Sequence, residues 1–101
     1  MDDYVSRLKN DDFDALFTAI LSLKSVEECY RFFEDVCTVQ ELFSISQRWD
    51  VARMLDTGVT YQEIASKLNA STATISRVNR CLVYGAGGYR MLLDRLSGEK
   101  E

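Results

Sequence analysis

The chain contains no histidine and no proline, and each absence excludes something. Without histidine there is no Ser–His or Cys–His nucleophile and no histidine-ligated metal site. Because proline interrupts helices, its absence favours an all-helical chain with short connections. No apolar run approaches the ~18 residues of a membrane span. The acidic start, Met1 to Tyr4, is unlike the basic start of a signal peptide, so we expect a cytoplasmic protein without a membrane partner.

Cysteine is scarce and scattered. Cys29, Cys37 and Cys81 form no C-x-x-C pair, so their spacing predicts neither a zinc site nor any other metal site. We expect reduced thiols and no tightly bound cofactor. A redox-sensing cysteine is the alternative, and the sequence offers it no resolving partner.

The remaining composition is that of one soluble globular domain. The chain has 101 residues, of which 47% are hydrophobic and 28% are charged. Twelve basic and 16 acidic residues give a net charge of −4, which by itself argues against a nucleic-acid binder.

The apolar residues recur at steps of three and four, which predicts an all-α fold of about six helices. The predicted helices span residues 11–24, 25–36, 38–56, 60–69, 71–83 and 89–96. Capping boxes open three of them, at Ser25/Glu28, Thr38/Glu41 and Thr60/Glu63. The long third helix has a predicted inner stripe of Leu42, Ile45, Trp49, Ala52 and Leu55. Residues 1–10 and 97–101 are predicted tails, and residues 11–96 a single domain.

The segment from Thr60 to Tyr84 has the parts of a helix-turn-helix: a short helix, a three-residue connection and a second helix. Ala65 is small where two helices would cross closely. Asn69 stands where the chain must turn, and Ile75 points back into the core. Small, turn and apolar residues at these offsets favour the motif.

The second helix of this motif has two distinct faces. Ile75, Val78 and Leu82 form the core stripe, and the opposite side carries Ala73, Ser76, Arg77 and Arg80. Residues 1–63 carry a net charge of −7 and residues 94–101 carry −1. Residues 64–93 contain no acid and four bases, Lys67, Arg77, Arg80 and Arg90. The positive patch therefore coincides with the helix-turn-helix, and local potential steers DNA more than net charge does.

These features favour binding of double-stranded DNA. We expect Thr72, Ala73 and Ser76 to approach base edges, and Lys67, Ser71, Thr74, Arg77 and Arg80 to hold the backbone. A protein-interaction module with the same fold is the alternative, favoured by the acidic net charge and by Tyr61 and Gln62 at positions where DNA binders often place cations. An enzyme would have to rely on carboxylates or a thiol. The densest acidic cluster, residues 11–14, is explained by a helix start, so we expect no catalysis.

Three segments resemble the Trp repressor superfamily, and most closely its YerC/YecD branch of small Trp repressor-like proteins. They are residues 46–55 (SQRWDVARML), Gly58 with residues 60–64 (TYQEI), and residues 70–77 (ASTATISR), of which the last is the most specific. Residues 20–24 and 27–33 extend the resemblance, which covers roughly residues 11–96.

The resemblance implies a six-helix fold that forms an intertwined homodimer. Such a dimer would place two helix-turn-helices about one DNA turn apart on a palindromic operator and would repress transcription. The aromatic residues agree with a dimer, because they offer more surface than short helices bury within one small subunit. They are Phe13, Phe17, Phe32, Phe33, Phe43 and Trp49.

The resemblance also implies a ligand pocket between the long helix and the recognition helix. Arg48 and Arg77 match the ligand-contacting arginines of the family, and Thr38 matches a threonine of the pocket rim. Val78 stands where the family has glycine, and Cys81 where a serine receives the amino group of the ligand. Because valine crowds the indole slot, we expect the pocket to take a ligand other than tryptophan, or none. The alternative for Arg48 is a structural ion pair.

Overall fold

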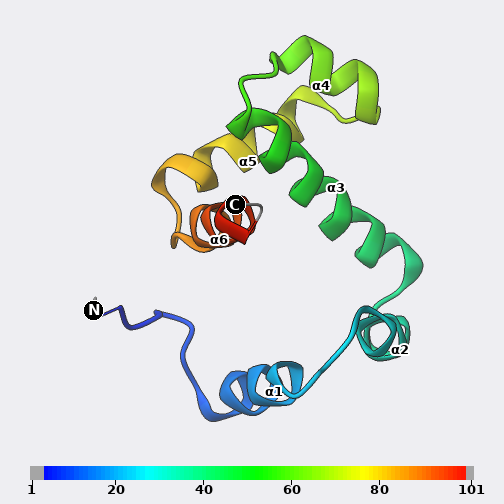
Figure 1. Ribbon diagram of the computed structural model, residues 1–101, viewed down its shortest axis with the longest axis vertical. Helices are drawn as coiled ribbons and strands as arrows, with labels where there is room; N and C mark the ends of the chain where they lie inside the picture. The colour runs from blue at the N-terminus through cyan, green and yellow to red at the C-terminus, as the bar shows by residue number, and fades with distance from the viewer. Residues whose placement is uncertain (1–3, 100–101) are drawn as a thin grey trace. The chain divides into compact units, whose positions relative to one another are not determined.

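The computed structural model describes residues 4–99, with Glu99 in its backbone only (Figure 1). This range contains six helices and no strand, which confirms the all-α prediction. The helices are α1 (Asp11–Leu21), α2 (Val26–Val36), α3 (Val39–Asp56), α4 (Tyr61–Leu68), α5 (Thr72–Tyr84) and α6 (Gly88–Glu99). Helix α6 continues beyond its predicted end at Leu96. Residues 1–3 and 100–101 of the predicted tails lie outside the described residues.

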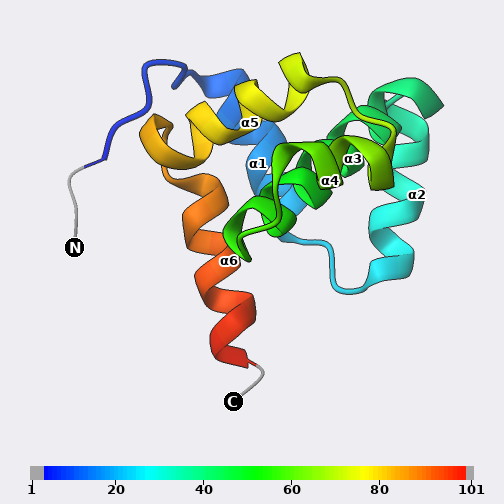
Figure 2. The same ribbon diagram turned by 90° about the horizontal axis from the view of Figure 1, so that it is seen from above.

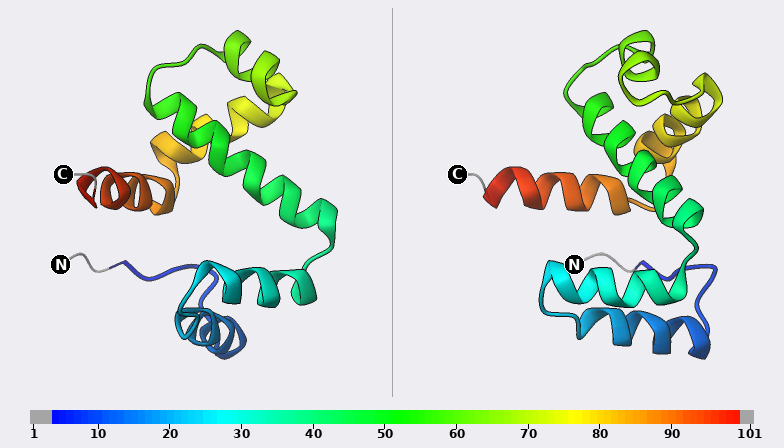
Figure 3. Two further views of the ribbon diagram at one scale, coloured as in Figure 1. Left: turned by 45° about the vertical axis from the view of Figure 1, so that its right-hand side comes forward. Right: turned by 90° about the vertical axis from the view of Figure 1, so that its right-hand side faces the viewer.

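The chain divides into two compact units, one ending at Thr38 and the other beginning at Val39. In the first unit, a short connection joins α1 to α2 (Figure 3). The side chain of Asn10 caps α1 by accepting from the Phe13 N–H at 2.7 Å. Neither helix buries a single residue. The apolar faces of α1 and α2 are therefore left without a covering partner inside this unit.

The start of α2 differs in detail from the predicted capping box. The Ser25 hydroxyl accepts from the Glu28 N–H at 3.1 Å, as expected. The Glu28 carboxylate, however, accepts from the N–H of Lys24 at 2.8 Å, and the predicted bond to the Ser25 N–H is not the one formed. Because Ser25 is the N-cap in both cases, the helix still begins where the sequence predicted.

The second unit is built on α3. Helices α4 and α5 pack on α3 and on each other, and α6 packs on α3 and α5 (Figures 1 and 2). The core consists of six buried residues from α3, α4, α5 and the turn between the last two: Val51, Ala52, Ile64, Ala70, Ile75 and Val78. The predicted stripe of α3 was wrong at Ile45, which is 47% exposed. Both core residues of α3 lie in its second half, so its first half keeps apolar side chains exposed.

A backbone motif ends α3 sharply. The Gly58 N–H donates to the Leu55 carbonyl at 3.1 Å, and the Val59 N–H donates to the Met54 carbonyl at 3.1 Å. Gly58 has a φ of 87°, a region that favours glycine. This pair of bonds is a Schellman motif, which satisfies carbonyls that the helix end would leave free. The predicted stop at Gly58 is confirmed, and α4 can start only a few residues later.

Candidate nucleic-acid interface

Local capping fixes the first helix of the helix-turn-helix. The Thr60 hydroxyl accepts from the Glu63 N–H at 3.2 Å, and the Glu63 carboxylate accepts from the Thr60 N–H at 3.3 Å. At the other end of α4, Asn69 adopts the left-handed conformation, with φ 53° and ψ 39°. Both the capping box and the turn residue were predicted, and both are confirmed. The buried Ala70 then leads the chain into α5.

The sequence analysis missed one contact that holds this turn. The Gln47 side chain on α3 donates from Nε2 to the carbonyl of Leu68 at 3.2 Å, in a partly buried place. That carbonyl belongs to the last residue of α4, where intrahelical partners run out. A polar residue on a helix carries no pattern that reveals a partner 21 positions away. Gln47 thus connects the central helix directly to the turn of the motif.

The recognition helix α5 begins with its own cap. The Ser71 hydroxyl accepts from the Thr74 N–H at 3.1 Å and donates to Thr74 Oγ1 at 3.0 Å. These two predicted backbone-binding residues are therefore engaged in capping. Thr72, Ala73 and Ser76 have exposed side chains. They are the small residues at the accessible start of α5.

The two faces of α5 separate as the sequence predicted. Ile75 and Val78 are 0% and 1% exposed and belong to the core. On the other side, Arg77 and Arg80 are exposed, and Lys67 is exposed at the end of α4. Within residues 4–99, no ion pair involves any of these three cations. The motif therefore presents free positive charge beside small side chains.

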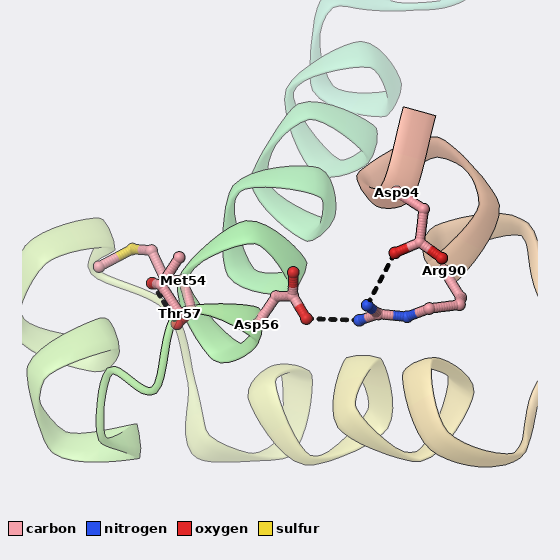
Figure 4. Close-up of polar contacts among 5 residues, drawn as sticks. All are labelled: Met54, Asp56, Thr57, Arg90 and Asp94. Carbon is pink, nitrogen blue, oxygen red and sulfur yellow. Dashed lines mark hydrogen bonds and ion pairs between the residues drawn. The ribbon is translucent and has the colours of Figure 1, made fainter. Parts of the chain in front are cut away.

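The fourth cation of the acid-free stretch is not free. Arg90 on α6 bonds to Asp56 at the end of α3 and, at 3.1 Å, to Asp94 on its own helix (Figure 4). The charge count along the sequence therefore overstated the positive patch, because it does not include the pairing of Arg90 with an acid 34 positions earlier in the chain. The available patch consists of Lys67, Arg77 and Arg80.

Tyr84 is an exposed residue that the sequence analysis did not assign to this face. It ends α5, is 83% exposed, and lies eleven positions after Ala73. That separation is close to three helical turns, so Tyr84 continues the row of Ala73, Arg77 and Arg80. The helical period alone would have been enough to predict that Tyr84 lies on this face.

A cavity of about 550 Å³ opens between α3, the C-terminal part of α5, the connection at residues 85–87 and α6. Two of the predicted pocket residues, Arg48 and Cys81, line it together with Trp49 and Tyr89. Arg77 does not line it, and Val78 is buried in the core instead. Thr38 belongs to the other unit. Arg48 donates from Nε to the Ser44 carbonyl at 3.3 Å, and it forms no ion pair with any described residue.

Two aromatic side chains form part of the wall of this cavity. The rings of Trp49 and Tyr89 stack, with centroids 6.4 Å apart and planes 18° from parallel. Burial raises the pKa of the Tyr89 phenol, an effect that the nearby positive charge of Arg48 partly opposes. The phenol is therefore neutral at physiological pH.

Three further observations concern the cysteines, metal binding and membrane spans in the part of the chain that the structure describes. All three cysteines are free thiols. Residues 4–99 contain no group of three or more His, Cys, Asp or Glu side chains arranged to hold a metal ion. No helix among them has the length and apolar character needed to cross a membrane.

Comparison with known proteins assigns this chain to a family. The family model of the Trp repressor protein matches residues 11–97, so the chain belongs to the Trp repressor family. Its fold is Trp repressor-like, and the family consists of DNA-binding regulators rather than enzymes. The resemblance noted in the sequence is thereby confirmed.

Individual relatives are similar over nearly the whole chain. YerC of Bacillus subtilis (strain 168) is 55% identical over 92 residues, which are 91% of this chain and 88% of YerC. The crystal structure of a TrpR-like protein from Eubacterium eligens ATCC 27750 is 57% identical, with a TM-score of 0.86, and covers 89% of this chain and 93% of that one. A structure from Staphylococcus aureus is 52% identical, with a TM-score of 0.85 and coverage of 89% and 90%.

Proposed function

We propose that this protein is a homodimeric, sequence-specific DNA-binding transcriptional repressor that reads its operator with α5. The observation that carries the proposal is the outer face of the helix-turn-helix. It presents small, exposed residues at the start of α5 and three unpaired cations beside them. Small residues let a helix start approach base edges closely, and arginine and lysine bind phosphates.

The proposed roles follow from these positions. Thr72, Ala73 and Ser76 contact bases, while Lys67, Arg77 and Arg80 contact phosphates. Ser71 and Thr74 hold the start of α5. The Thr74 N–H is already donated to the Ser71 hydroxyl, so the backbone N–H groups that this helix start offers to a phosphate are those of Thr72 and Ala73. A protein-interaction module remains the second candidate, because Tyr61 on α4 is 37% exposed and no cation surrounds it on the first turn.

Selection of bound sequences from random duplexes, with and without a metabolite pool, tests the function directly. A palindromic consensus with half-sites about one helical turn apart is expected for a dimer. If the selected duplexes share no consensus, the protein does not bind DNA specifically, and the protein-interaction module is favoured. A consensus that emerges only with metabolites would identify an effector, for which the cavity beside Arg48 and Cys81 is the proposed site.

Replacing Arg77 and Arg80 together by alanine is expected to weaken binding to every duplex. A dimer would lose four cationic contacts, so the slope of log K against log salt should fall by roughly 3 to 4. Salt titrations of the selected operator and of an unrelated duplex measure both slopes. As the matched variant, Ala73→Lys should mainly change which sequence is preferred. Unchanged operator binding by the double variant would refute the assignment.

Exposed apolar side chains carry the homodimer part of the proposal. Phe17 is 55% exposed on α1, and Phe43 is 63% exposed on α3. Leu92 and Leu96 on α6 are 46% and 45% exposed. Exposed apolar side chains in this number mark interfaces in soluble proteins. The single domain over residues 11–96 is part of the same proposal.

Sedimentation should therefore find a dimer in the wild type. Phe17→Asp and Phe43→Asp are expected to shift it toward monomer, because each places a charge in the proposed interface. Lys67→Ala should remain dimeric, since Lys67 lies on the proposed DNA face. A wild-type protein that sediments as a monomer at micromolar concentration would contradict the dimer.

A further inference from the structure

The first turn of α6 contacts α3 through a forked ion pair. The Arg90 guanidinium donates from Nη2 to Asp56 and from Nη1 to Asp94, the latter at 3.1 Å (Figure 4). The hydrogen bond to Asp56 raises the pKa of Arg90 above its ordinary value, so the guanidinium stays charged. Asp94 lies one turn further along α6, so its contact with the guanidinium stays within that helix and does not reach α3. Arg90 links α6 to the last residue of α3.

The preceding residue on α6 contacts α3 at a second point. Tyr89 stacks on Trp49, and its ring packs against the core of the second unit. Trp49 lies seven positions before Asp56, which is about two helical turns. Two contacts separated along α3 fix the direction of α6, whereas one contact would allow α6 to pivot.

Both ends of the helix-turn-helix connect to this junction. Asp56 stands directly before the turn that leads to α4, and local hydrogen bonds hold that turn. The Thr57 hydroxyl donates to the Met54 carbonyl at 3.0 Å, beside the Schellman bonds (Figure 4). The far end of α5 passes into α6 through residues 85–87 alone. The angle at which α6 lies on α3 therefore constrains the C-terminal end of the recognition helix.

We propose that Tyr89 and Arg90 form a clamp on Trp49 and Asp56 that sets the direction of the recognition helix. The clamp residues act as positioning residues for DNA binding and do not touch DNA themselves. This inference rests on the proposed function. It assigns Arg90 a role that its place in the positive stretch of the sequence would not suggest, since that place favours a phosphate contact.

The two roles of Arg90 predict opposite results for Asp56→Asn. This substitution breaks the ion pair between α3 and α6, leaves Arg90 bonded only to Asp94 on its own helix, and removes one negative charge from the unit. If Arg90 were a phosphate ligand, the variant would bind all duplexes more tightly. For a clamp, operator affinity falls by about tenfold, the cost of roughly one lost base contact, while an unrelated duplex is bound as well as before or better. Asp94→Asn is the matched control, which keeps the α3–α6 bond and should stay within about twofold, the effect usual for surface changes.

The aromatic contact has its own pair of variants. Tyr89→Phe keeps the ring and should bind the operator like the wild type. Tyr89→Leu removes the stacking partner of Trp49 and should lower operator affinity by about tenfold, again with little change on the unrelated duplex. The melting temperature and sedimentation of each variant show whether it is still a folded dimer. Unfolding would weaken binding to both duplexes equally, whereas misplacement of α5 would weaken binding to the operator alone.

Hydrogen exchange tests the clamp without DNA. In Asp56→Asn and Tyr89→Leu, amides in residues 80–92 should exchange faster, while those of α4 remain protected. Unchanged exchange there, or parallel changes on both duplexes, would overturn the clamp. If the wild type prefers no duplex, the proposed function fails, and the exchange data still decide whether Tyr89 and Arg90 hold α5.

Discussion

Replacing Ile75 by alanine is expected to lower the free energy of unfolding by about 2 to 5 kcal/mol. Ile75 is completely buried and lies on α5 in the core shared by α3 and α4. The substitution removes apolar contacts and leaves a cavity that three packed helices cannot close. Such a loss is a large share of the stability of a small domain.

Urea denaturation at a fixed protein concentration measures this change, because a dimer's stability depends on concentration. Ile75→Val is the conservative variant and should cost about 0.5 to 1.5 kcal/mol. The neighbouring Ser76→Ala should stay within about 0.5 kcal/mol, since Ser76 is exposed. A loss below about 1 kcal/mol for Ile75→Ala would show that this site is less tightly packed than the structure indicates.

Gly85→Ala is expected to destabilise the protein by about 1 to 3 kcal/mol and to weaken operator binding. A Cβ at this position would lie 2.4 Å from the Cys81 carbonyl oxygen and 3.0 Å from Cys81 Cα. These are backbone atoms, which cannot turn away as a side chain can. The Gly85 N–H also donates to that carbonyl at 2.8 Å, so relief of the clash would open the last turn of α5.

Gly88→Ala is the matched control for this prediction. A Cβ at Gly88 meets nothing within 4 Å, and Gly88 is the first residue of α6. Alanine there should be neutral or stabilise by up to about 1 kcal/mol, because glycine loses more conformational freedom on folding. Thermal melts and operator titrations of both variants give the comparison. Equal behaviour of the two would rule out a steric requirement at Gly85.

The parts of the site that depend on near neighbours could be predicted from the sequence. The Thr60/Glu63 capping box joins residues three positions apart, and the left-handed turn at Asn69 reflects the preference of one residue. The separation of Ile75 and Val78 from Arg77 and Arg80 follows from the helical period. The resemblance to the Trp repressor family rested on the same local segments, and the family match confirms it.

Contacts between distant residues could not be predicted in this way. Nothing in the sequence pairs Gln47 with the carbonyl of Leu68 or Arg90 with Asp56. The predicted stripe of α3 failed at Ile45 for the same reason: periodicity identifies an apolar face but not how much of its length a neighbouring helix covers.

The sequence by itself determined where the helices begin to within one residue, which side of α5 is apolar, and which family the chain belongs to, because capping and helical period act over a few residues. It placed the ends of α1 and α6 less well, since α1 stops at Leu21 and α6 continues past Leu96. Only the tertiary structure decided which charges stay free. Charge is conferred by residue type, but its availability depends on partners that folding brings close. Lys67, Arg77 and Arg80 remain open for a ligand, whereas Arg90 is held by Asp56 and Asp94.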